Sequence, residues 1–159
     1  MVKEIGMPDW LAHVLFAYVL CKVLGFKFKT FRRGEYVAIV MLGSLVPDVV
    51  KIGMLFDLFN IWIWDCIEPL HTPAGSLLVS ALISLLFRDS IVFPLLVLGF
   101  ATHYFLDFLM GHVSGGMLLL FPFSWNEYQL GLIHCDEYRV ALIMSVLAIL
   151  MYSITRRSR

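Results

Sequence analysis

The segment Ile91–Met110, IVFPLLVLGFATHYFLDFLM, decides how this chain folds. It is apolar over nearly its whole length, yet it carries His103 and Asp107 near its end. Side chains four residues apart on a helix share a face, so this imidazole and this carboxylate point the same way. An Asp near the centre of a membrane helix costs about 2.5–3.5 kcal/mol. A metal ion, a hydrogen bond or a water-filled cavity must therefore offset that cost.

The composition extends this pattern to the whole chain. Of the 159 residues, 60% are hydrophobic and 15% are charged, and the mean hydropathy is +0.86. A soluble domain usually has about 45–50% apolar and about 25% charged residues. The sequence predicts an all-α, polytopic transmembrane helical bundle, with residues 1–159 as a single integral-membrane domain and no cleaved signal peptide. We expect about five spans, at Trp10–Phe26, Tyr36–Phe56, Pro73–Phe87, Ile91–Met110 and Arg139–Thr155.

The charged residues indicate how these spans are oriented. If the N-terminus lies outside, nine of the twelve Lys and Arg residues fall on the cytoplasmic side, and ten of the twelve Asp and Glu residues fall on the outer side. Cytoplasmic loops of membrane proteins carry an excess of Lys and Arg. We therefore expect a multi-pass protein of the cytoplasmic (inner) membrane, with its N-terminus outside and its C-terminus in the cytoplasm.

This orientation brings polar residues from distant segments to one depth. All five His residues fall in the outer half of the membrane or in outer loops. His13 lies near the outer start of the first span, His71 precedes the third, and Asp107 lies near the end of the fourth. Asp48 lies about 18 Å from the cytoplasmic start of the second span, at 1.5 Å per residue. Chance would scatter such groups, so the sequence predicts one outward-facing polar site.

A proline interrupts the second span beside Asp48. Pro47 lacks a backbone donor and disfavours helix at the preceding residue, so we expect a kink or break within residues 43–48. Asp48 then either caps the restarted helix or points into a cavity, and both roles are compatible.

A second proline opens the third span. Thr72 and Pro73 are typical of an N-cap followed by the first helical position. His71, just before them, is either a residue at the water interface or a ligand held ahead of a helix N-terminus, where anions such as phosphate also bind. Likewise, His13 alone would be an ordinary hydrogen-bonded residue, and His103 with Asp107 would be an ordinary pair along one helix.

The segment Gly111–Glu137 adds weaker candidates. Its glycines favour an irregular turn, and its apolar stretch is too short to span. His112 is a candidate ligand beside Asp107, and His134 and Glu137 are further candidates that a solvated loop explains equally well. Cys66 and Cys135 lie in outer loops and would form a disulfide in an oxidising space. The sequence has no Gly-rich phosphate loop and no nucleic-acid motif.

Several motifs, taken in order, resemble a known family. They are Met7-Pro8-Asp9 before His13, then Gly43-Ser44-Leu45-Val46-Pro47-Asp48, His71-Thr72-Pro73, His103-Tyr104-Phe105-Leu106-Asp107 and Leu119-Leu120-Phe121-Pro122-Phe123-Ser124. The chain is similar in them to the YdjM-like membrane-bound predicted metal-dependent hydrolases. That family is distantly similar to zinc-dependent phospholipase C and the P1-type nucleases, which are all-helical phosphodiesterases.

The resemblance implies a set of metal ligands, comprising His13, Asp48, His71, His103, Asp107 and, at a departing spacing, His112. Imidazole and carboxylate groups suit zinc, manganese or iron, and this many ligands would hold one or two divalent ions, with zinc preferred.

Three functional hypotheses follow from these residues. The first is metal-dependent hydrolysis of a phosphoester, with a membrane lipid headgroup as the accessible substrate and Asp48 or Asp107 as catalytic carboxylates. The second is a non-enzymatic structural or partner-binding membrane protein in which the same groups form a metal-free polar network. The third is haem held by two His residues of the first and fourth spans. Packing between subunits is permitted but not specified.

Overall fold

The computed structural model describes residues 9–110, 116–133 and 137–157 of the chain. All the regular elements in these ranges are helical, which confirms the predicted all-α class. In chain order they are α1 (Asp9–Lys27), η1 (Lys29–Arg32), α2 (Gly34–Gly43), η2 (Pro47–Ile52), α3 (Gly53–Asp57), α4 (Trp64–Ile67), η3 (Glu68–His71), α5 (Pro73–Ser84), α6 (Val92–Leu109) and α7 (Glu137–Arg157), where η denotes a short 3-10 helix.

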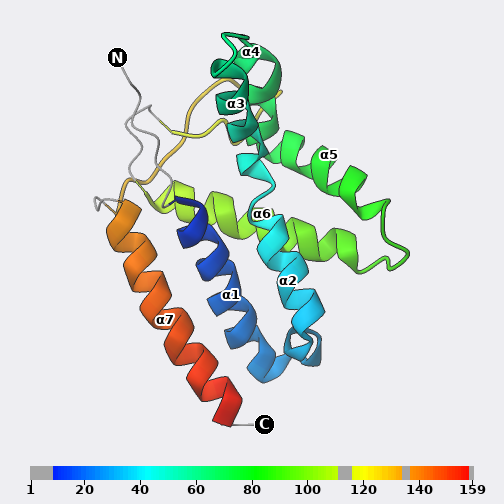
Figure 1. The fold of residues 1–159 in the computed structure, drawn as a ribbon, viewed down its shortest axis with the longest axis vertical. Coiled ribbons are helices and arrows are strands. Elements are labelled where there is room, and N and C mark those ends of the chain that lie inside the picture. Colours follow the sequence, from blue (N-terminus) through cyan, green and yellow to red (C-terminus); the bar gives the residue numbers. More distant parts are fainter. Residues whose placement is uncertain (1–8, 111–115, 134–136, 158–159) are drawn as a thin grey trace.

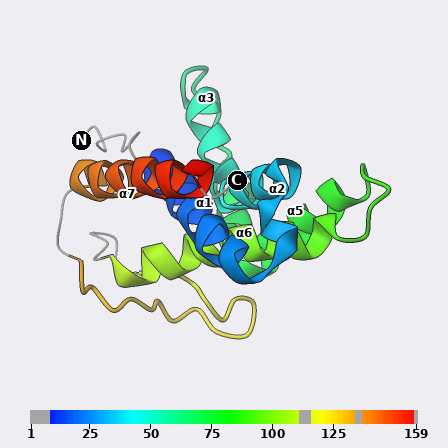
Figure 2. The ribbon, with the colours of Figure 1, turned by 90° about the horizontal axis from the view of Figure 1, so that it is seen from below.

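The helices form two layers. Helices α7, α1 and α2 lie in one layer, and α6 crosses behind α1 and α2 with α5 packed beyond it (Figures 1 and 2). Helix α6 contacts α1, α2 and α5, so it is the element that joins the two layers. Ten of its eighteen residues are buried, whereas α1 and α7 expose many large apolar side chains. A helix that exposes apolar side chains in this way suits a lipid environment.

The predicted spans are confirmed only in part. Among the described residues, three helices are long and apolar enough to cross a membrane, at Trp10–Lys27, Val92–Leu109 and Tyr138–Arg156. The predicted second span is broken, with α2 and the Pro47–Asp57 segment meeting at 57°, so it counts as a fourth span only if the bent pair is one span. The predicted third span is a helix of 12 residues, about 18 Å long, which is too short to cross a bilayer about 30 Å thick.

The break in the second span begins directly after α2. Helix α2 ends at Gly43, and Pro47 is the first residue of η2, where its missing N–H costs nothing. The Asp48 N–H bonds to the Leu45 carbonyl at 3.1 Å instead of reaching back to Ser44. The Ser44 carbonyl is therefore released from the α-helical hydrogen-bond pattern and is available to a side chain of α6.

Two glycines allow α2 and α6 to touch backbone to backbone. A Cβ on Gly99 would lie 2.2 Å from the Val40 carbonyl oxygen, and a Cβ on Gly43 would lie 2.5 Å from the Leu96 carbonyl oxygen. Only glycine fits at both points. Small residues at helix crossings allow this close approach in membrane bundles.

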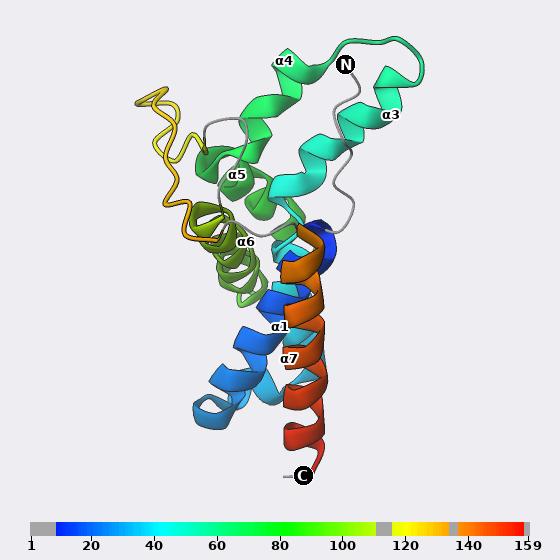
Figure 3. The ribbon, with the colours of Figure 1, turned by 90° about the vertical axis from the view of Figure 1, so that its left-hand side faces the viewer.

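The two ends of the molecule differ in character. Arg32 closes the end of α1, where its Nε donates to the Gly25 carbonyl at 2.8 Å and its Nη2 to the Phe26 carbonyl at 3.3 Å. The C-terminal end of α7 lies at this same basic end (Figure 1). At the opposite end, α3 and α4 project beyond the bundle (Figure 3), and the turn between them exposes large apolar side chains, at Leu58, Phe59, Ile61 and Trp62.

The segment 116–133 packs on α6. The Leu130 N–H bonds to the Phe108 carbonyl at 2.8 Å, and the Ile133 N–H bonds to the Leu109 carbonyl at 2.9 Å. These bonds satisfy carbonyls that the end of a helix leaves without intrahelical partners. Cys66 is exposed, whereas Cys135, its predicted disulfide partner, lies outside the described residues.

Candidate metal centre

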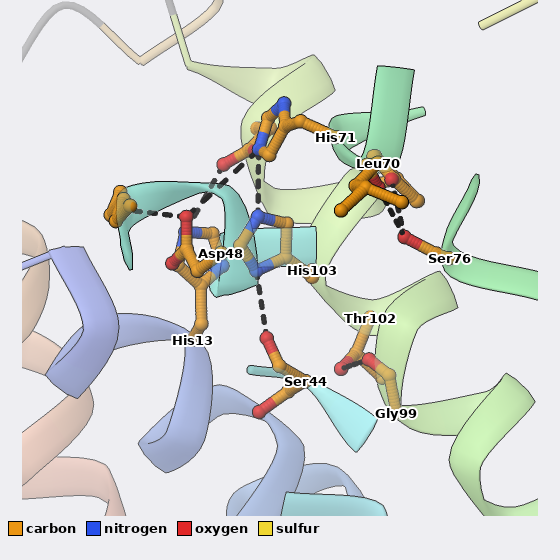
Figure 4. Close-up of polar contacts among 12 residues, drawn as sticks. His13, Ser44, Asp48, Leu70, His71, Ser76, Gly99, Thr102 and His103 are labelled. Carbon is orange, nitrogen blue, oxygen red and sulfur yellow. Dashed lines mark hydrogen bonds and ion pairs between the residues drawn. The ribbon is translucent and has the colours of Figure 1, made fainter. Parts of the chain in front are cut away.

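Five of the six predicted ligands meet at one place, away from the end of the bundle that holds η1 and the C-terminal end of α7. They come from four elements, with His13 on α1, Asp48 on η2, His71 on η3, and His103 and Asp107 on α6. Figure 4 shows His13, Asp48, His71 and His103 pointing toward one another. They form two overlapping groups in which one ligand atom per residue lies within 4.8 Å of the others: His13, Asp48 and His103, and His71, His103 and Asp107.

Asp107 lies between two imidazole rings. Its Oδ1 is 3.1 Å from His13 Nε2, and its Oδ2 is 3.1 Å from His103 Nε2. All three side chains are at most 4% exposed. The i,i+4 pair predicted on α6 is therefore present, and α1 adds a second imidazole to the same carboxylate.

The two ring nitrogens of His103 face different acceptors. Its Nδ1 lies 2.8 Å from the Ser44 carbonyl oxygen, which can only accept, so Nδ1 must carry the hydrogen of this bond. Its Nε2 lies 3.1 Å from Asp107 Oδ2, so this nitrogen either shares a proton with the carboxylate or presents a lone pair to it. Two facing acceptors repel unless a proton or a cation lies with them. A His that donates its second N–H to a backbone carbonyl is also the usual arrangement around metal ions.

Asp48 is buried beside the ammonium group of Lys51. Its Oδ1 lies 2.8 Å from Lys51 Nζ and 4.0 Å from His71 Nε2. Its Oδ2 is buried and has no hydrogen-bond partner within the described parts of the chain. Burying a charged oxygen without a partner is costly, so this atom also favours a cation nearby.

Local capping fixes the position of His71. The Thr72 hydroxyl oxygen accepts from the Gly75 N–H at 3.1 Å, as the predicted N-cap requires. A Cβ on Gly75 would lie 2.3 Å from the Pro69 carbonyl oxygen, so η3 folds tightly over the start of α5. Ser76 and Tyr104 then share a buried hydrogen bond of 2.7 Å that ties this corner to α6.

The His71 ring forms part of the mouth of the cluster. Its side chain is 31% exposed, and its Nε2 lies 4.0 Å from Asp107 Oδ2. Burial lowers the pKa of His71 below its usual value, and the neighbouring His103 lowers it further, although both carboxylates oppose this shift. The ring is therefore held in the neutral form, which is the form that binds metals.

The donor set fits a divalent metal ion. Two atoms bound to one zinc ion at about 2.0–2.2 Å lie roughly 3.0–3.5 Å apart, and both contacts of Asp107 with His13 and His103 are 3.1 Å. The geometry does not fit haem between the same two histidines, because their rings are stacked with centroids 3.7 Å apart and no porphyrin plane fits between them.

The remaining predicted candidates are not tested by the structure. His112 and His134 lie outside the described residues. Glu137 begins α7, and nothing is described of its side chain.

Three participants were not predicted from the sequence. Lys51 lies one helical turn after Asp48, and that spacing alone was a usable signal. The Ser44 carbonyl gave no signal, because its role depends on the break at Pro47 and on the approach of α6. Tyr104 lies inside the HxxxD string, and its ring meets those of His71 and His103 edge-on, with centroids 6.0 and 5.7 Å away.

Comparison with known proteins gives one match. The model of a family described as YdjM inner membrane protein matches residues 7–159. No curated protein and no solved structure matches the chain.

Proposed function

The chain belongs to the YdjM family of inner membrane proteins, and on that premise we propose that it is a metal-dependent phosphoester hydrolase of the membrane. It is a multi-pass inner membrane protein, so the proposal concerns the chemistry of its His and Asp cluster. The proposal rests on one observation: two buried imidazoles, those of His13 and His103, converge at 3.1 Å on the Asp107 carboxylate, and the Nδ1 of His103 donates to the Ser44 carbonyl as in metal-binding histidines. A divalent ion held by these groups would compensate the buried negative charge of the carboxylate.

The proposed ligands are the three imidazoles and the two carboxylates of the cluster. We assign Asp107 as a ligand because two imidazoles already hold it in place. Asp48 has a buried oxygen without a hydrogen-bond partner among the described residues, so we assign it the orientation of the attacking water. A bound divalent ion would polarise the phosphoester and make the water a stronger nucleophile. Hydrolysis of a phosphodiester by water would then yield a phosphomonoester and an alcohol.

Elemental analysis of the protein purified in detergent tests the proposal. We expect at least one mole of bound transition metal per chain, with zinc as the first candidate. Strong chelation should remove the metal and lower the melting temperature, and re-addition should restore both. Less than one mole of metal per chain in a folded protein would overturn the proposal. A screen of soluble phosphodiesters and phospholipids then tests the reaction.

A second candidate function rests on the contacts inside the cluster. Each carboxylate already lies close to a potential cation: His13 and His103 are 3.1 Å from Asp107, and Lys51 is 2.8 Å from Asp48. If His13 or His103 is protonated, these contacts form a metal-free network that stabilises a structural or partner-binding protein. In that case His103→Ala lowers the melting temperature, while metal content and phosphoesterase activity are the same in both proteins.

A further inference from the structure

We propose that Lys51 is the residue that recognises the phosphate group of the substrate at the mouth of the cluster. This inference rests on the proposed function, because it assumes that a phosphoester approaches a metal-loaded site. It adds a binding residue and a direction of approach to that site.

The exposure of the side chains locates the mouth. His13, Asp48, His103 and Asp107 are at most 4% exposed at their side chains, whereas His71 is 31% and Lys51 is 25% exposed. Among the described members of the cluster, only Lys51 and His71 therefore reach solvent. A substrate that approaches from this side meets the ammonium group before it meets the buried carboxylates.

The charges of the cluster favour an anion once a metal is bound. With neutral imidazoles, the carboxylates of Asp48 and Asp107 and the ammonium of Lys51 leave one net negative charge. A single divalent ion changes this to one net positive charge, and a second ion increases it further. The loaded site therefore attracts a dianion or monoanion such as a phosphoester, and Lys51 supplies the positive charge nearest to solvent.

The contacts of Lys51 allow it to change partners. Its Nζ lies 2.8 Å from Asp48 Oδ1 and 5.7 Å from the centre of the Trp10 ring. A metal ion on Asp48 draws away the negative charge that holds the ammonium, so the ion pair weakens on loading. The four-carbon stem then lets Nζ move to a phosphate oxygen while it stays beside Trp10.

Binding of inorganic phosphate to the zinc-loaded, desalted protein in detergent tests this role by calorimetry. We expect Lys51→Met to weaken phosphate binding about tenfold or more, the effect of losing one hydrogen bond to a charged group. Lys51→Arg should bind phosphate within a few-fold of the wild type. Lys29→Met, an exposed lysine at the opposite end, is the matched control and should leave the affinity unchanged.

The zinc content of each variant separates this inference from the proposed function. We expect Lys51→Met to bind as much zinc as the wild type, because the variant frees Asp48 for the metal. A wild type that binds no metal overturns the proposed function. A zinc-loaded wild type that binds no phosphate, or a zinc-loaded Lys51→Met that binds it equally well, overturns the inference alone.

Two substrate types distinguish the sources of the phosphate. If hydrolysis is observed, Lys51→Met should raise the KM for a soluble phosphodiester and for phosphatidylglycerol in mixed micelles by similar factors, with little change in kcat. A rise for the lipid alone would mean that Lys51 senses the anionic surface of the micelle. That outcome would contradict recognition of the phosphate group.

Discussion

His103 has a different acceptor on each ring nitrogen, and this arrangement gives the cluster its chemistry. The Ser44 carbonyl fixes the hydrogen on Nδ1, and Nε2 is directed at Asp107 Oδ2, 3.1 Å away. Asp107 in turn holds the ring of His13 on its other oxygen. One carboxylate therefore orients two imidazoles from two helices, and its charge is essential to both contacts.

Removing that charge while keeping the shape tests the role of Asp107. We expect Asp107→Asn to reduce bound zinc from about one mole per chain to less than a tenth, because the amide is a poor ligand and no longer orients His13 and His103. Elemental analysis measures the change. Asp89→Asn, an exposed carboxylate before α6, is the control and should retain the metal. Full zinc content in folded Asp107→Asn would contradict this assignment.

At the scale of elements, the break between α2 and η2 builds one wall of the site. Because Pro47 has no N–H and starts η2, the chain leaves the α-helical ladder, and the Ser44 carbonyl becomes available to α6. The same break directs the Asp48 side chain toward the cluster. The break in the helix thus supplies both the proposed ligand Asp48 and the Ser44 carbonyl, which orients His103.

Continuing α2 as a regular helix through residue 48 should break the contact between the Ser44 carbonyl and His103. With Pro47→Ala, the Asp48 N–H can bond to Ser44 as in a regular helix, and His103 loses its acceptor. We expect zinc affinity to fall about 10- to 100-fold, the usual effect of losing such an outer contact. Competition with a chelator measures it. Pro94→Ala, in the first turn of α6, is the matched control, and an equal loss in both variants would contradict this explanation.

The crossing of α2 and α6 sets the distance between the α2–η2 break and the ligands on α6. We expect Gly99→Ala to destabilise the protein by about 1–3 kcal/mol, because its Cβ would lie 2.2 Å from the Val40 carbonyl oxygen and the helices must separate. Thermal unfolding in detergent measures this effect, and the zinc affinity should fall with it. Gly34→Ala is the control, since nothing lies within 4 Å of its added methyl group. Equal melting temperatures for the two variants would show that the crossing tolerates a methyl group.

At the scale of the whole molecule, a basic surface and the candidate site lie at opposite ends. The basic residues of η1 and of the end of α7 lie at one end, and the His and Asp cluster lies toward the other, where α3 and α4 project (Figures 1 and 3). The distribution of Lys and Arg predicts that the cluster faces outward, and this orientation stays a prediction.

Thiol labelling in intact cells tests the orientation. In a Cys21→Ser, Cys135→Ser background, we expect a membrane-impermeant maleimide to label Cys66, which is exposed on α4. A cysteine introduced by Lys29→Cys in a Cys-free background should react only after the membrane is permeabilised. The reverse pattern would place the cluster on the cytoplasmic side.

The sequence predicted more of the site than of the membrane topology. His13, Asp48, His71, His103 and Asp107 were named from their common depth in the predicted topology and from the family motifs, and the structure brings them together. Metal binding by these residues stays a prediction. The break beside Pro47 was predicted and is present, but the five spans were less accurate, because hydropathy records that a segment is apolar and not that α5 ends too soon to cross the membrane. The Ser44 carbonyl and the Gly43–Gly99 contact depend on tertiary approach, which no local pattern encodes.

The origin of the ligands in four separate elements has a consequence for synthesis. His13 enters the membrane with the first helix, while Asp107 is made almost a hundred residues later. Until α6 is inserted, the imidazole of α1 lacks the carboxylate that later holds it, so the nascent first helix must keep it near water. The centre therefore forms only as a late step of biogenesis, and a chain that stops before α6 carries three of its five groups without the two that organise them.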